Sequence, residues 1–259
     1  MLLQDRIAIV SGIGPGMGRD ISLAFAREGA HLVLAARGAD KLEAVAAEVR
    51  ALGRRAMCVS TDIAKLEDCE RLVKAARDEF GRVDVLVNNA FKGPSFKTFE
   101  DDDLGAWRQV FDVNVFGSLQ LSKLVVPLMK EQGGGSVVFI NSMSMRIIEA
   151  THGGYAASKG ALMTAAQVLA KELGRYKIRV NTVVPGYIWG PSLQGYFKLL
   201  AQQQGTTPEA VYESVASQTA LHKIPDSEEI SGAVLFFASD LSRAITGQAL
   251  DVNGGHFFH

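Results

Sequence analysis

A tyrosine and a lysine, Tyr155 and Lys159, carry the most distinctive chemistry in this sequence. They stand four residues apart in GGYAASKGAL, among glycine, alanine and serine. Residues four apart on a helix share a face, so the phenol and the ammonium point the same way. A nearby cation favours the phenolate and lowers a tyrosine pKa from its ordinary value of about 10. The spacing predicts an acid/base that exchanges a proton with an alcohol or ketone. Many Tyr/Lys pairs on solvated helix surfaces have the same spacing, so a surface pair is the alternative.

A glycine-rich turn near the N-terminus is the second candidate site. Gly12, Gly14, Gly16 and Gly18 follow an apolar run and precede a helical stretch. A dinucleotide fingerprint needs this context, because glycine lets the backbone approach a pyrophosphate and the helix N-terminus offers N–H groups. The spacing differs from the commonest G-x-G-x-x-G, so a glycine turn without a ligand stays an alternative. The small residues around Tyr155, Gly153 and Gly154 among them, are expected to admit cofactor and substrate and to let the helix pack tightly.

The end of the second apolar run indicates which dinucleotide would bind. An acidic residue there would bond the ribose 2′-hydroxyl of NAD, but this chain has Ala36 followed by Arg37. A guanidinium binds phosphate with two hydrogen bonds, which favours the 2′-phosphate of NADP(H) over NAD(H). Pro15 adds no second charge, and a purely solvated Arg37 is the alternative.

The elements that must position these residues alternate along the chain. Strands are expected at 7–10, 32–35, 56–60, 83–89, 136–141, 178–185 and 249–252, and helices at 40–52, 66–80, about 104–131 and about 154–173. Nearly continuous apolar runs are typical of parallel strands covered on both faces. The alternation predicts an α/β fold, a single doubly wound Rossmann-like domain over residues 1–259 with a seven-stranded parallel sheet flanked by helices on both faces. Residues 190–224 break this rhythm and predict an insertion of short helices that covers the substrate.

Composition argues against several other classes of protein. The 27 basic and 28 acidic residues give a net charge of −1, so nothing marks a nucleic-acid partner. No apolar run could cross a membrane and the N-terminus lacks a secretory signal, which predicts a cytoplasmic protein. Cys58 and Cys69, with no clustered histidines, predict no metal site. A solvated helix start accounts for the acidic cluster at 100–103.

Nearly the whole chain resembles the short-chain dehydrogenase/reductase superfamily. The resemblance runs from the glycine turn to ITGQALDVNGG and rests on several ordered motifs. These are SGIGPGMG, NNA at 88–90, Asn114 in VNV, Ser142 in INSMS, YAASK, and PG at 185–186. Each motif is weak alone, but their order and spacing together are very specific.

The resemblance implies a role for each matching residue. Ser142 would bond the substrate oxygen, Tyr155 would pass the proton, and Lys159 would bind the nicotinamide ribose and lower the tyrosine pKa. Asn114 would hold a water that links Lys159 to solvent. The implied cofactor-binding residues are Gly12, Gly14, Gly16, Met17, Gly18, Arg37, Asp62, Ile63, Asn88, Ala90, Tyr155, Lys159, Pro185, Gly186 and Ile188.

Four positions depart from the family pattern. Phe91 follows NNA where a glycine is usual, and Gly190 stands where a threonine often bonds the nicotinamide carboxamide. Pro15 and Asn253 are the other two departures. None removes a group needed for hydride transfer, but Phe91 and Gly190 leave the pose of the cofactor open.

The function expected from these residues is an NAD(P)-dependent oxidoreductase that interconverts a secondary alcohol and a ketone. The expected substrate-binding residues are Phe91, Ser142, Met143, Ser144, His152, Tyr155, Trp189 and Tyr196. Their bulk favours a hydrophobic small-molecule substrate, although several of them could equally be core residues. Lys92 and Arg146 could instead meet an acidic tail, which leaves a 3-oxoacyl-thioester reductase open.

A catalytically silent module that senses a nicotinamide cofactor is the alternative from another class. Such modules usually lose one member of the Tyr/Lys pair, and this chain keeps both. An enoyl reductase of the same fold is disfavoured, because the resemblance implies a wider Tyr–Lys spacing there. The small residues at 154–165 and the helix at 104–131 suit subunit contacts. The resemblance implies a homotetramer, with a dimer open.

Overall fold

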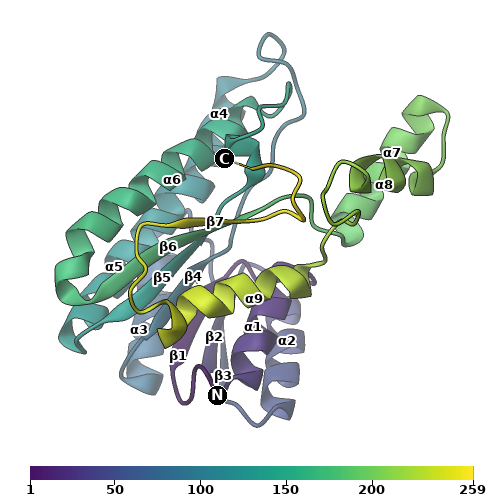
Figure 1. Cartoon of the computed structure of the whole chain (residues 1–259). Coiled ribbons are helices and arrows are strands. Elements are labelled where there is room, and N and C mark those ends of the chain that lie inside the picture. The colour runs from purple at the N-terminus through teal and green to yellow at the C-terminus, as the bar shows by residue number, and fades with distance from the viewer. Residues whose placement is uncertain (259) are drawn as a thin grey trace.

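Seven parallel strands form one sheet in the computed structural model, which describes residues 1–258 (Figure 1). The strands are β1 (Ile7–Ser11), β2 (His31–Ala36), β3 (Ala56–Ser60), β4 (Val85–Asn88), β5 (Gly135–Ile140), β6 (Ile178–Pro185) and β7 (Ala249–Val252). Their order across the sheet is β3-β2-β1-β4-β5-β6-β7, and each neighbouring pair is parallel. The predicted seven-stranded parallel sheet is confirmed.

Helices cover both faces of the sheet (Figure 1). They are α1 (Met17–Arg27), α2 (Ala39–Ala51), α3 (Leu66–Phe80), α4 (Leu104–Phe111), α5 (Ser118–Glu131), α6 (Gly153–Leu173), α7 (Pro191–Gln204), α8 (Pro208–Ala216) and α9 (Ser227–Ala238). Successive strand residues face opposite sides. Ala8 and Val10 of β1 therefore pack with α1, α2 and α9, whereas Ile7 and Ile9 pack with α3, α5 and α6. This is the predicted doubly wound, Rossmann-like arrangement.

The winding direction reverses between β1 and β4, which are neighbours in the sheet. From β1 the chain continues to β2 on one side, and from β4 it continues to β5 on the other. The loops after these two strands therefore diverge at the carboxyl edge. Open α/β sheets bind their ligands at this switch point.

The expected helix at 104–131 contains a segment of different helical geometry. A π-helical segment, Asp112–Gly117, separates α4 from α5 and contains Asn114. Single π-helical turns inside α-helices occur frequently at functional sites. The predicted helix at about 104–131 is confirmed, since the three helical segments follow one another without a gap from Leu104 to Glu131. The π-helical part was not predicted, because the contacts of the Asn114 side chain described below are tertiary and leave no periodic signal in the sequence.

The segment that breaks the strand–helix rhythm contains α7 and α8. They have a buried cluster of their own, composed of Phe197, Ala201, Val211, Ala216 and Ile224. Figure 1 shows this pair beyond the N-terminal end of α9, standing out from the body of the sheet. Among the described residues, no helix combines the length and the apolar character needed to cross a bilayer.

Candidate active site

The glycines of the β1–α1 turn divide into two kinds. Gly12 has φ +76°, and a Cβ there would lie 2.5 Å from the backbone of Ala90; a Cβ on Gly18 would lie 2.5 Å from the carbonyl of Gly12. These two glycines are required by packing. At Gly14 and Gly16 a Cβ would meet nothing within 4 Å, and Gly16 caps α1 without a side-chain bond. This open, side-chain-free helix start fits a pyrophosphate.

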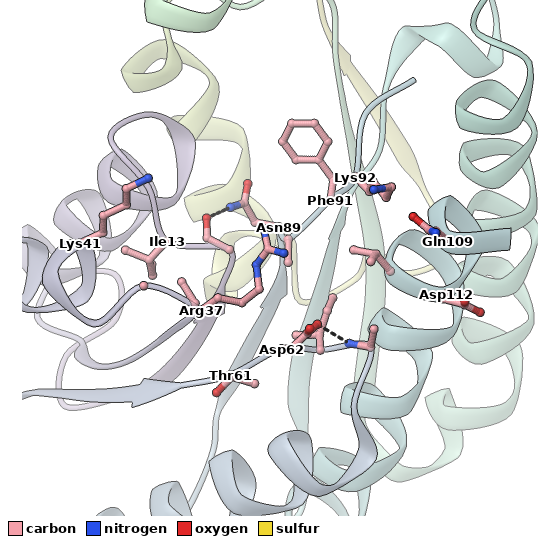
Figure 2. A pocket seen from close by; sticks show the side chains of 17 residues that line it. Ile13, Arg37, Lys41, Thr61, Asp62, Asn89, Phe91, Lys92, Gln109 and Asp112 are labelled. Atoms are coloured by element: carbon pink, nitrogen blue, oxygen red, sulfur yellow. Dashed lines mark hydrogen bonds between the residues drawn. The ribbon is translucent and has the colours of Figure 1, made fainter. Parts of the chain in front are cut away.

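A pocket of about 530 Å³ lies beside this turn (Figure 2). Five of the predicted cofactor residues line it: Gly12, Arg37, Asp62, Ile63 and Ala90. The predicted cofactor residues outside its lining are Gly14, Gly16, Met17, Gly18, Asn88, Tyr155, Lys159, Pro185, Gly186 and Ile188. Of these, Pro185 and Gly186 lie at the end of β6, and Ile188 packs against the α1 side of the core.

The pocket has a second cation that the sequence analysis missed. Arg37 and Lys41 are both exposed, and both line it. Figure 2 shows the Arg37 guanidinium reaching toward the pocket between Asn89 and Asp62, with Lys41 beyond Ile13. The sequence did offer a signal for Lys41, because it lies four residues after Arg37, at the start of α2. Two cations at this place fit an additional phosphate better than one.

Paired asparagines connect the two diverging loops. The Asn89 side chain, another residue that sequence reasoning missed, donates to the carbonyls of Ser11 at 3.1 Å and Gly12 at 2.9 Å. Asn88 is 2% exposed and donates to Ser122 Oγ at 3.0 Å, while its Oδ1 has no partner among the described residues. The NNA motif therefore fixes the floor of the switch point, which gives the glycine turn a rigid base.

Tyr155 and Lys159 lie on one face of α6, as their spacing predicts. Lys159 is 3% exposed, and its ammonium donates to the carbonyl of Ile140 at 2.8 Å. The same ammonium lies 5.6 Å from the centre of the Tyr155 ring. Burial lowers the pKa of Lys159 to about 7, because the charged form is desolvated.

The pKa of Tyr155 moves opposite to the expectation. Burial raises it from 10.0, and a hydrogen bond with Ser142 opposes this rise. The sequence argument assigned the lowering of the pKa to the Lys159 charge, with a further contribution from a bound oxidised nicotinamide. In the structure, burial of the phenol is the largest cause of the shift, and the Ser142 hydrogen bond opposes it. Tyr155 is therefore a group that holds its proton through neutral pH.

Ser142 follows β5 directly and caps a short 3₁₀ segment, Met143–Met145. Its Oγ accepts from the Ser144 N–H at 3.2 Å and lies 3.1 Å from the Ser144 hydroxyl. The neighbouring Asn141 accepts from the Ser142 N–H at 2.9 Å and donates to the Lys159 carbonyl at 3.1 Å. Asn141, which sequence reasoning missed, thus ties the end of β5 to the helix of the Tyr/Lys pair.

Asn114 links the loop after β4 to α6. It is 1% exposed, and its Oδ1 accepts from the Lys92 N–H at 2.7 Å. Its Nδ2 donates to the Lys92 carbonyl and to Ser158 Oγ, both at 3.0 Å. The side chain is a structural clamp next to the reactive pair. Its expected role in holding a water beside Lys159 stays a prediction.

The predicted substrate residues only partly gather around Tyr155. The Phe91 ring is 65% exposed and meets the Tyr155 ring edge-on at 6.4 Å. Phe96, which the sequence analysis did not select, contacts the rings of His152 at 5.3 Å and Tyr196 at 5.8 Å. This aromatic group joins the loop after β4 to α7.

Three other residues proposed for the substrate side have different surroundings. Trp189 packs on Tyr212 at 4.7 Å, within the α7–α8 cluster. Met143 is buried. Arg146, considered for an acidic substrate tail, forms an ion pair with Asp251 of β7 at 2.9 Å. That interpretation of Arg146 was wrong, because its guanidinium already has a carboxylate partner.

Comparison with known proteins gives matches along nearly the whole chain. The family model described as enoyl-(acyl carrier protein) reductase matches residues 12–256. The chain is 33% identical to 7α-hydroxysteroid dehydrogenase of Escherichia coli (strain K12) over 253 residues, 98% of this chain and 94% of that protein. It is 34% identical to L-rhamnose 1-dehydrogenase (NAD(P)(+)) of Azotobacter vinelandii, covering 99% of this chain and 98% of that protein.

Solved structures agree with these relatives. L-sorbose reductase from Gluconobacter frateurii, complexed with NADPH and L-sorbose, superposes with a TM-score of 0.94 at 30% identity, covering 99% of this chain and 98% of that one. A 7α-hydroxysteroid dehydrogenase complexed with NADH and 7-oxo glycochenodeoxycholic acid gives 0.89 at 33% identity, covering 98% and 94%. The ordered motifs, the doubly wound sheet and these matches agree, and the chain belongs to the short-chain dehydrogenase/reductase superfamily of oxidoreductases.

Proposed function

We propose that this protein interconverts a secondary alcohol and a ketone on an apolar substrate, with NADP(H) preferred over NAD(H). One observation carries the proposal. Tyr155 lies beside both Lys159 and Ser142 at the carboxyl edge of the sheet, where Asn141 ties β5 to α6. The open glycine turn lies at the same edge. An acid/base and a cofactor cradle on one rigid edge are what hydride chemistry needs from a protein.

The bound nicotinamide would supply or accept the hydride. In the reducing direction Tyr155 holds a proton on its phenol oxygen and donates it to the substrate oxygen. The Ser142 hydroxyl donates a hydrogen bond to that same oxygen and orients it. In the oxidising direction the phenolate takes the proton back, and the Lys159 ammonium stabilises that negative charge. Lys159 would also bind the ribose of the nicotinamide.

The preference for NADP(H) rests on Arg37 and Lys41 at the pocket rim. Neither side chain has a carboxylate partner in the part of the chain that the structure describes. Relatives of this chain are found with either cofactor, since the sorbose reductase structure contains NADPH and the hydroxysteroid dehydrogenase structure contains NADH. The two cations therefore carry this part of the proposal.

The preference for an apolar substrate rests on exposed aromatic rings near Tyr155. Phe91 is 65% exposed and Phe96 is 56% exposed, and both lie on the loop after β4. The relatives include a hydroxysteroid dehydrogenase as well as sugar enzymes. Exposed aromatic rings favour an apolar substrate over a sugar. With Arg146 paired to Asp251, Lys92 is the remaining cation that would favour a thioester with an acidic tail.

We propose further that residues 1–259 are one domain in which 190–224 cover the substrate, and that the protein is a homotetramer. The contact of Phe96 with Tyr196 supports the covering role, because it joins α7 to the loop beside Tyr155. The last residue of the proposed domain lies outside the described residues.

Turnover of a carbonyl panel with NADPH and with NADH tests the proposal. The panel holds apolar cyclic ketones, ketoses and a 3-oxoacyl thioester, and oxidation of the cofactor is followed by its absorbance. We expect NADPH-dependent reduction of the cyclic ketones. Tyr155→Phe should lower turnover by at least about 100-fold and keep the affinity for NADPH. Preferred turnover of the thioester would support the acyl-reductase alternative instead.

Cofactor binding without turnover of any carbonyl compound would favour the sensing module. Full turnover by Tyr155→Phe would overturn the assignment of the acid/base. Reduction of a conjugated carbon–carbon double bond in place of the ketone would show an enoyl reductase, the activity in the description of the matching family.

A further inference from the structure

The first turn of α6 lies directly against an indole ring from α4. A Cβ on Gly154 would lie 2.8 Å from Cγ of Trp107, and a Cβ on Gly153 would lie closer still to the far side of the same ring. Real Cβ atoms do not approach carbon atoms so closely. Both positions therefore need glycine to make room for Trp107. The expected tight packing of this helix is confirmed at these two glycines, and the expectation that they admit cofactor and substrate is corrected.

The indole is itself held in place. Its Nε1 donates to Asp102 Oδ2 at 2.8 Å, and the same carboxylate accepts from the Ser95 hydroxyl at 2.6 Å. Asp103 caps α4 by accepting from the Gly105 N–H at 2.9 Å. The acidic cluster that the sequence analysis explained as a solvated helix start therefore has two defined tasks, which are to cap α4 and to orient Trp107.

Tyr155 is the residue immediately after the glycine pair. Further along α6, Lys159 is fixed by the carbonyl of Ile140, and Asn141 holds the backbone there. The start of the helix has no side-chain cap, since His152 makes no capping bond. Ser158, which Asn114 holds, donates to the Tyr155 carbonyl at 2.7 Å from the far side of the first turn. Before Tyr155, the contact with Trp107 limits how closely the helix start approaches α4, and with it the position of the Tyr155 phenol relative to Ser142.

We propose that Trp107 is a positioning residue for Tyr155, and that Gly153 and Gly154 are glycines because the indole occupies the space of a side chain. This inference rests on the proposed acid/base role of Tyr155. Trp107 touches no reacting atom in this scheme. It acts through the backbone of α6, and displacement of a catalytic group by about 1 Å can lower turnover by about 100-fold.

A double-mutant cycle between Gly154→Ala and Trp107→Ala tests the contact. Each single change should lower kcat by about 10- to 100-fold with little change in KM or in NADPH affinity. In the Trp107→Ala background the added methyl group has room, so Gly154→Ala should lower kcat by less than about threefold there. Trp107→Phe keeps a ring on the glycines and should restore most of the turnover.

Gly232→Ala is the matched control. Gly232 is exposed in the middle of α9, and a Cβ there would meet nothing within 4 Å. This variant should keep wild-type kcat and KM. An equal cost of Gly154→Ala in both backgrounds, or unchanged kcat in all the variants, would overturn the inference while leaving the proposed function intact.

Ionisation of the Tyr155 phenol gives a readout that does not depend on turnover. The near-ultraviolet absorbance change with pH is compared between each variant and the same variant carrying Tyr155→Phe. We expect the Tyr155 titration to shift in Trp107→Ala and to stay in place in Gly232→Ala. If the wild type reduces no carbonyl compound, the proposed function fails and this titration alone decides whether Trp107 positions the phenol.

Discussion

The ammonium of Lys159 donates to the carbonyl of Ile140, 2.8 Å away at the end of β5, and the side chain is 3% exposed. A cation is thereby enclosed at the carboxyl edge of the sheet, 5.6 Å from the centre of the Tyr155 ring. Burying a charge without a carboxylate partner is costly for folding. Active sites commonly retain such a destabilising group because their chemistry needs it.

Lys159→Met should stabilise the fold, by an amount that depends on pH. The pKa of Lys159 is about 7 in the folded chain and ordinarily 10.5. The unfolded chain binds the extra proton between these values, so the wild type gains stability as pH rises through that window. The free energy of unfolding of Lys159→Met should therefore exceed that of the wild type by the largest amount below about pH 7. This difference should shrink by about 2–3 kcal/mol toward pH 9.

Urea unfolding of both proteins at several pH values measures this difference. Lys171→Met is the control, since Lys171 is exposed on the same helix, and its effect should not vary with pH. A stability difference between Lys159→Met and the wild type that stays constant from neutral to alkaline pH would show that the buried ammonium has an ordinary pKa.

The pH profile of reduction should be flat through neutrality. Reduction needs the protonated phenol of Tyr155, and burial raises its pKa above 10.0. kcat/KM for the ketone, which reports the free enzyme, should therefore fall only at strongly alkaline pH. Oxidation of the alcohol needs the phenolate and should rise with pH, by about tenfold per pH unit below about pH 7 and less steeply above it, where Lys159 loses the charge that stabilises the phenolate.

Ser142→Ala should move the alkaline limb of this profile to higher pH. The hydrogen bond from Ser142 is the contribution that lowers the pKa of Tyr155, so its loss raises that pKa further. The profile of kcat/KM against pH is measured for the variant and the wild type with the same ketone. A limb that moves toward neutral pH would assign the acid to another group.

Arg37→Ala should raise KM for NADPH by about 10- to 100-fold, the value of a charge-assisted hydrogen bond, and leave KM for NADH unchanged. Adding Lys41→Ala should raise KM for NADPH further, since both cations line the pocket. Arg77→Ala, an exposed arginine of α3 outside that lining, is the control. Equal losses for the two cofactors would place the 2′-phosphate elsewhere.

The two kinds of glycine in the first turn should respond differently to alanine. Gly14→Ala meets open space, so the variant should unfold like the wild type but bind the coenzyme at least about tenfold more weakly. Gly12→Ala forces a Cβ to 2.5 Å from Ala90 at a positive φ and should cost about 2–4 kcal/mol of stability. Thermal unfolding and coenzyme titration separate the two effects. Tight coenzyme binding by Gly14→Ala would argue against a phosphate at this turn.

The sequence predicted the strands and most helices closely because the pattern of apolar residues is local. β3 and β6 have the predicted bounds, 56–60 and 178–185. The π-helical segment within the 104–131 helix was missed, because the bonds of Asn114 to Lys92 and Ser158 join residues distant in the chain. Lys41 was missed although it lies only four residues after Arg37, since its place in the pocket lining depends on how α2 leaves β2.

The sequence by itself determined the order of the elements, the shared face of Tyr155 and Lys159, and the glycine turn after β1, since each follows from spacing along the chain. Tertiary structure decided what surrounds these groups. It buried the phenol and reversed the direction of its pKa shift, gave Arg146 a partner in Asp251, and laid Trp107 against the glycines before Tyr155. Burial and pairing depend on residues brought together from distant parts of the chain, and spacing along the sequence does not encode them.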